Sequence, residues 1–116
     1  MTELLGVGAT GAQMMVNGDD SAAVVTYPDG LTVTMNFLVK APYGFSVAAT
    51  GHKGAFESSA TYDPTGAVAV VRTFTKMFRT GAEPFSDARM LAPLAVLEAM
   101  DKSLQRKTAV KVAKVE

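Results

Sequence analysis

The sequence predicts an α+β fold in which an open antiparallel β-sheet carries two α-helices on one face. Strand-like stretches with alternating apolar residues fill the first half of the chain, and helix-like stretches follow them. Strands grouped before helices, rather than alternating with them, are typical of antiparallel sheets with helices segregated to one side. The chain has 116 residues. That length is typical of one domain, so we expect residues 1–116 to form a single domain.

The first strands are expected in the first third of the chain. Every second residue from Leu31 to Val39 is apolar, which predicts a strand with one buried face. A preceding apolar run at residues 22–27 is connected to it by Pro28-Asp29-Gly30, which is typical of a tight turn. The two stretches therefore predict an antiparallel hairpin. A further short strand is expected around residues 14–16.

A second pair of strands is expected at Phe45–Thr50 and Ala55–Tyr62. Gly51-His52-Lys53-Gly54 separates them, and two glycines around two polar residues suit a tight turn. At the other end of the chain, valines alternate with lysines between Thr108 and Val115. This tail predicts a last, partly exposed edge strand whose lysines discourage association with other strands.

A first helix is expected after Tyr62. Asp63 suits the N-cap, Pro64 suits the first helical position and Gly81 suits the C-terminus. Apolar residues recur between them at helical spacing, namely at Val70, Val71, Phe74, Met77 and Phe78.

A second helix is expected from Ser86, a suitable N-cap, to about Gln105. We expect Pro93 to kink it or to limit its first turn. Its expected apolar residues are Met90, Leu94, Leu97 and Leu104, with Ala95, Ala99 and Met100.

Composition excludes several classes of function. Eleven basic residues balance eleven acidic ones, so there is no global charge that would attract nucleic acid. Cysteine is absent, which excludes disulfides and thiolate metal sites, and His52 is the single histidine. No long apolar stretch or basic leader is visible. We therefore expect a cytoplasmic protein with no metal and with neither a membrane nor a nucleic-acid partner.

Residues Gly6–Gly11 match the G-x-G-x-x-G pattern of dinucleotide-binding loops. That pattern needs a strand before it and a helix after it, and the flanking stretches are too short for either. The acidic ribose partner would have to be Asp29, which belongs to the expected hairpin turn. We interpret the segment as a flexible glycine-rich connector, with a nucleotide loop as the alternative.

Two groups of residues are candidates for binding. His52 and Lys53 are adjacent and could contact an anionic or hydroxylated ligand, although a purely structural turn is the preferred interpretation. The second group lies on the side of the long strand opposite its apolar residues. This face is mixed enough to pack against another sheet, which makes it a candidate homo-oligomer interface, and it comprises Thr32, Thr34, Asn36 and Leu38. No catalytic, cofactor-binding or metal residue is expected.

The order of these features resembles the second, C-terminal domain of the glucose–fructose oxidoreductase / inositol dehydrogenase / MocA (Gfo/Idh/MocA) family. The resemblance begins near Asp20 and rests on the order and spacing of Tyr27–Leu31, Phe45–Gly54, Phe78–Phe85, Ala99–Ser103 and the final Lys/Val-rich tail. It implies an open antiparallel sheet that binds a sugar-like substrate and mediates oligomerisation. It implies NAD or NADP only for the parent family, because the family's nucleotide loop and catalytic residues lie upstream of the matched part. His52 corresponds to a turn position and takes no catalytic role.

The leading hypothesis is therefore a C-terminal substrate-binding and oligomerisation module of an NAD(P)-dependent sugar or polyol oxidoreductase. We expect it to be inactive alone, with the nucleotide-binding Rossmann domain supplied elsewhere. The alternative is a stand-alone, non-enzymatic binding or scaffold module that forms homo-oligomers through its sheet. A third hypothesis is a small nucleotide-binding protein that uses Gly6–Gly11.

Overall fold

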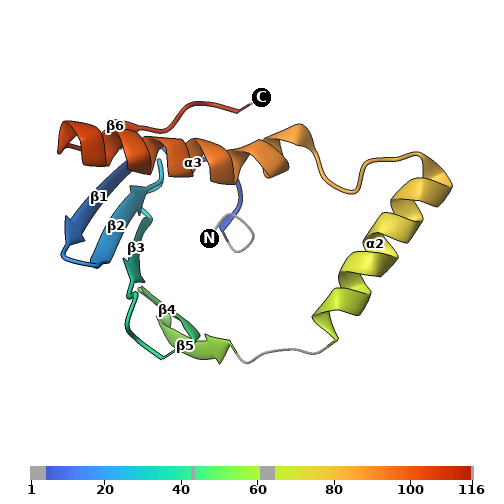
Figure 1. Cartoon of the computed structure of the whole chain (residues 1–116), viewed down its shortest axis with the longest axis horizontal. Helices are drawn as coiled ribbons and strands as arrows, with labels where there is room; N and C mark the ends of the chain where they lie inside the picture. The colour runs from blue at the N-terminus through green and yellow to red at the C-terminus, as the bar shows by residue number, and fades with distance from the viewer. Residues whose placement is uncertain (1–4, 43, 61–64, 116) are drawn as a thin grey trace. The chain divides into compact units, whose positions relative to one another are not determined.

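A computed structural model describes residues 5–42, 44–60 and 65–115 of the chain (Figure 1). Its described residues form six strands in antiparallel sheets and two helices, which confirms the α+β class. The chain divides into two compact units, and the first is discontinuous in sequence. It comprises Met1–Val39 and Phe85–Glu116, whereas the second comprises Lys40–Pro84.

The first unit contains a four-stranded antiparallel sheet. Its strands are β1 (Gly11–Asn17), β2 (Asp20–Thr26), β3 (Thr32–Phe37) and β6 (Val110–Lys111), in the order β3-β2-β1-β6. The predicted hairpin of β2 and β3 is confirmed, as is the short strand around residue 15. Gly30 takes a positive φ of 83° in the hairpin turn, which a residue with a side chain adopts less readily. The predicted last strand is much shorter than expected, because only two residues of the tail pair with β1.

Helix α3 (Asp87–Arg106) covers one face of this sheet. The register aligns Ala12 with Val25 and Val25 with Val33, so that these side chains share the face below the helix. The buried core consists of Ala12, Ala23, Val25, Tyr27, Val96, Ala99 and Met100. Met35 and Val33 of β3 pack against it, while the residues between them are exposed. The predicted alternation is therefore confirmed at Val33 and Met35, but Phe37 and Val39, which were expected on the same buried face, are 42% and 69% exposed.

The predicted bounds of α3 are confirmed, and its predicted apolar face is right at Ala95, Ala99 and Met100 but wrong at most of its large residues. Ser86 caps the helix by accepting a hydrogen bond from the Arg89 amide at 3.3 Å, and the helix continues through Pro93. The buried side chains are Ala92, Ala95, Val96, Ala99, Met100 and Ser103. Met90, Leu94 and Leu97 are instead about half exposed. Small side chains let the helix approach the sheet closely, which explains why the alanines and not the leucines face it.

The second unit contains a separate hairpin and the other helix. Strands β4 (Phe45–Gly51) and β5 (Gly54–Ala60) form their own two-stranded sheet, and α2 spans Gly66–Thr80. The expected single sheet with two helices on one face is therefore wrong: the four-stranded sheet carries α3, and α2 belongs to the second unit. Gly81 ends α2 as predicted, with φ of 65° and its amide bonded to the Met77 carbonyl at 2.8 Å.

The N-terminus of α2 differs from the prediction. Thr65 occupies the N-cap and makes no side-chain capping bond. Asp63 and Pro64, the predicted cap and first helical residue, lie outside the described residues.

Candidate functional site

The four-stranded sheet has an open face opposite α3. We call it the open sheet face, and its members on the three long strands are Gln13, Met15, Ala22, Val24, Thr32, Thr34 and Asn36. The register places them in cross-strand rows, such as Gln13, Val24 and Thr34. Met15 is 57% exposed, and Val24 is half-buried at the centre. The face thus combines an apolar centre with polar side chains along β3.

The structure brings together three of the four predicted interface residues. Thr32, Thr34 and Asn36 are exposed and alternate along β3 on the open sheet face. Leu38 follows the last residue of that strand and is 58% exposed. It therefore lies outside the paired region, and the period-two pattern could not show this because it continues past the point where pairing ends.

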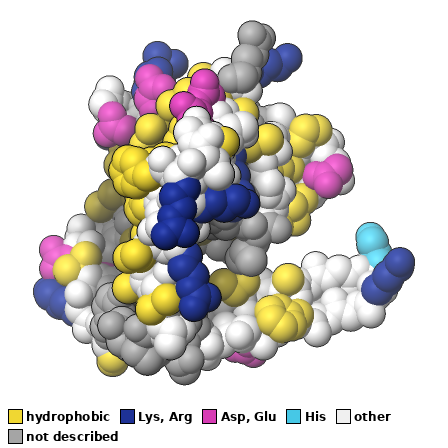
Figure 2. Space-filling model, turned by 90° about the vertical axis from the view of Figure 1, so that its right-hand side faces the viewer, with side chains coloured by type: hydrophobic (Ala, Val, Ile, Leu, Met, Phe, Trp, Pro, Cys, Tyr) yellow, Lys and Arg dark blue, Asp and Glu magenta, His cyan; other side chains and the backbone are white. Residues whose placement is uncertain are grey.

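His52 and Lys53 form the turn between β4 and β5, as predicted, and both are exposed. Figure 2 shows the chain's single histidine, in cyan, at the surface beside a basic side chain. Within the part of the chain that the structure describes, no group of three His, Asp or Glu residues could hold a metal ion.

The glycine-rich segment Gly6–Gly11 leads directly into β1. Gly6 and Gly8 have positive φ values of 76° and 126°, but no helix begins after them. The segment therefore lacks the helix N-terminus that a dinucleotide loop places against phosphate. Thr10 is fixed by its amide, which donates to the Thr26 carbonyl at 2.8 Å. The connector is consequently anchored at its end, which the interpretation as a flexible link did not anticipate.

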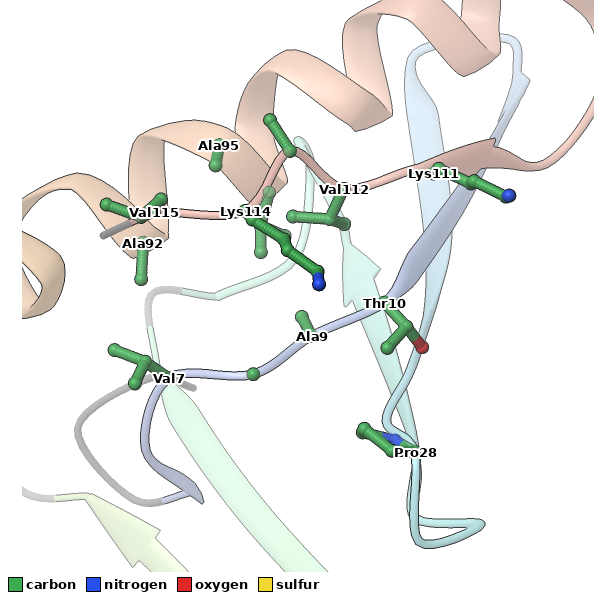
Figure 3. Close-up of a pocket in the computed structure, with 13 residues that line it drawn as sticks. Val7, Ala9, Thr10, Pro28, Ala92, Ala95, Lys111, Val112, Lys114 and Val115 are labelled. Carbon is green, nitrogen blue, oxygen red and sulfur yellow. The ribbon is translucent and has the colours of Figure 1, made fainter.

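A cavity of about 560 Å³ opens in the first unit (Figure 3). Three segments that are far apart in sequence line it, together with Pro28: residues 7–10, the N-terminal half of α3 and the tail at 111–115. A hydrogen bond from the Val112 amide to the Thr10 carbonyl, at 3.0 Å, joins the tail to the N-terminal segment. The sequence contained no signal for this cavity, because each segment contributes only a few ordinary apolar side chains.

Tyr27 lies next to this region and is 8% exposed. Its hydroxyl donates a hydrogen bond to the Gly6 carbonyl at 3.5 Å. Burial raises the pKa of the Tyr27 phenol above its ordinary value, because ionisation would place a charge in a poorly solvated site. At neutral pH the side chain is therefore a neutral hydrogen-bond donor.

The second unit exposes its apolar side chains. In α2, Val70, Val71, Phe74 and Phe78 are between half and four-fifths exposed. The hairpin register places Phe45, Val47 and Phe56 on one side of β4 and β5, and all three are exposed as well. Hydrophobic side chains are visible at the surface in Figure 2. None of the described residues of this unit is buried.

Comparison with family models, with curated proteins and with solved structures finds no match to this chain. Of the helices in the described ranges, none is long and apolar enough to cross a membrane.

Proposed function

We propose that this chain is a non-catalytic sheet module that associates with a second copy of itself through the open sheet face. The observation that carries the proposal is the one-sided covering of the four-stranded sheet. Helix α3 buries Ala12, Ala23 and Val25 on one side, whereas the opposite side leaves Met15 and Thr34 exposed. Antiparallel sheets commonly pack face to face, and a mixed polar and apolar surface suits an interface that forms and separates.

The size of this face sets the expected strength of association. Three long strands about 4.8 Å apart and about 22 Å long cover roughly 300 Å² on each copy. A stable interface of standard size buries about 800 Å² on each partner. We therefore expect a weak dimer whose population depends on protein concentration.

Sedimentation velocity over a wide range of protein concentration tests this proposal. We expect the sedimentation coefficient to rise with concentration, and Thr34→Glu to abolish the rise because two like charges would meet across the dimer axis. Ser46→Glu, which adds the same charge to an exposed strand position of the other unit, is the control and leaves association unchanged. A chain that stays monomeric throughout, or two variants that behave alike, would contradict the proposal.

We further propose, more specifically, that this module belongs to an NAD(P)-dependent sugar or polyol oxidoreductase of the Gfo/Idh/MocA type. It is supported by the residue patterns Tyr27–Leu31 and Phe45–Gly54, which form hairpin segments in the structure. The described residues offer no helix N-terminus after Gly6–Gly11 to hold a dinucleotide. A separate domain would then bind the nucleotide. This chain would bind the sugar or polyol substrate and mediate contacts between subunits.

Enzyme assays and the upstream coding sequence separate these functions. We expect no reduction of NAD+ or NADP+ with any sugar or polyol by the 116-residue chain, and measurable turnover would overturn the non-catalytic proposal. An in-frame nucleotide-binding domain upstream would favour the oxidoreductase module over a stand-alone scaffold. The nucleotide-binding hypothesis requires NAD binding that is lost in Gly8→Val.

A further inference from the structure

We propose that the cavity between residues 7–10, α3 and the tail binds a small aliphatic carboxylate, with its chain inside the cavity and its carboxylate at Lys114. The proposal concerns a different surface from the open sheet face and does not depend on oligomerisation. A volume of about 560 Å³ falls within the roughly 300–1,000 Å³ of small-molecule sites.

The cavity exists because small side chains line it. Ala92 and Ala95 face it from α3, and Ala9 faces it from the N-terminal segment (Figure 3). Larger residues at these positions would fill the space. Hydrogen bonds hold the tail against the N-terminal segment: the Val112 amide donates to the Thr10 carbonyl at 3.0 Å, and the Thr10 amide donates to the Thr26 carbonyl at 2.8 Å.

The lining favours an apolar ligand over a sugar or a nucleotide. Nine of its thirteen residues are aliphatic or proline, namely Val7, Ala9, Pro28, Ala92, Ala95, Val96, Val112, Ala113 and Val115. Among the described lining residues Thr10 supplies the one side-chain hydroxyl, which already donates to the Thr26 carbonyl at 3.1 Å. A sugar would leave several hydroxyl groups without partners in such a site, and that costs binding free energy.

The charge of the lining determines the polar end of the ligand. Lys111 and Lys114 are its charged members, and among the residues that the structure describes no acidic side chain lines it. In Figure 3 the Lys114 side chain extends across the cavity towards Ala9, whereas the Lys111 ammonium points away from it. A single cation at the edge of an apolar cavity complements a ligand that has one negative charge and an aliphatic chain.

Decanoate, used below its micelle concentration, is a suitable probe. We expect a saturable NMR titration of the full chain in which the methyl groups of Ala92 and Ala95 shift. Decanol, which has the same chain without the charge, should bind more weakly. Lys114→Met removes the charge and keeps the aliphatic stem, so it should weaken decanoate binding up to about fivefold, the range of an exposed ion pair, and leave decanol binding unchanged.

Lys111→Met is the matched control, because it removes a lysine of the same cavity whose ammonium points elsewhere. It should leave decanoate binding close to that of the unaltered chain. Three results would overturn the proposal: no saturable binding, shifts confined to the exposed apolar side of α2, or equal effects of the two lysine variants. The backbone spectrum of each variant shows whether it is folded, and Lys114→Gln replaces Lys114→Met if the latter is not.

Discussion

The Ser103 hydroxyl of α3 accepts a hydrogen bond from the Met14 amide of β1 at 3.0 Å. Strand β6 pairs only with Gly11 and Ala12, so the edge of β1 lacks a neighbouring strand at residue 14. Ser103 is fully buried, and its side chain takes the place of the missing strand. The helix thus contributes to the hydrogen bonding of the sheet as well as to its packing.

Ser103→Ala should destabilise the first unit by about 1–3 kcal/mol, because it leaves the part-buried Met14 amide without its acceptor. Urea unfolding followed by circular dichroism measures this change. Ser58→Ala, at an exposed hairpin position, should stay within about 0.5 kcal/mol of the unaltered chain. Equal urea midpoints of unfolding for the two variants would show that the hydrogen bond between Met14 and Ser103 does not contribute to stability.

Val25→Ala should also destabilise the first unit, by about 2–3 kcal/mol, because Val25 is fully buried between the sheet and α3. This loss of stability is the transfer free energy of the two missing methyl groups plus the free-energy cost of the cavity that they leave. Val68→Ala in α2 is the matched control, since that valine is 48% exposed and alanine favours helices. A similar loss of unfolding free energy in both variants, measured by urea unfolding, would mean that the Val68 side chain is covered in solution.

The raised pKa of Tyr27 predicts a loss of stability at alkaline pH. The folded chain holds the phenolic proton more tightly than the unfolded chain, so the stabilisation is complete below the unfolded pKa of about 10. It is lost as the pH rises from that value through the folded pKa. Absorbance titration near 295 nm should show a late tyrosinate phase that is missing in Tyr27→Phe. If the late phase persists in that variant, another tyrosine is responsible.

Hydrogen exchange should distinguish the two units. We expect amides in β1, β2 and α3 to exchange only on global unfolding, because these elements surround the buried core. Amides in α2 and in the β4–β5 hairpin should exchange much faster, since none of the described residues there is buried. Equal protection in the two units would instead indicate that the apolar side chains of the second unit are covered by a partner.

Much of the secondary structure was predictable, because it depends on local patterns. Alternation from Leu31 to Val39 identified β3 and its inward-facing Val33 and Met35, although it continued past the end of the strand, and Ser86 identified the start of α3. The buried side of α3 was predictable only in part: Ala95, Ala99 and Met100 were expected on the apolar face and are buried. Leu94 and Leu97 were expected there too and are exposed, although they are more apolar than the alanines that face the sheet. Close packing rather than apolar character decided which side is buried.

The separation into two sheets and the cavity also escaped prediction, for a different reason. Nothing local distinguishes the hairpin of β4 and β5 from a continuation of the first sheet, because both have alternating apolar residues. The cavity is formed by segments about one hundred residues apart, such as Ala9 and Val112. Single-residue patterns carry no information on such distant pairings.

The discontinuity of the first unit has a consequence for synthesis and folding. Its first strands leave the ribosome early, but their partners Val96, Met100 and Ser103 follow only after the whole second unit. Contacts of such long range slow folding. The entropy of closing the intervening loop grows only slowly with its length, by about 0.6 kcal/mol per doubling, so a segment of this size between β3 and α3 is tolerated at equilibrium. Until α3 emerges, the nascent β1–β3 sheet exposes its apolar face, and this is the interval in which the chain is most dependent on protection from aggregation.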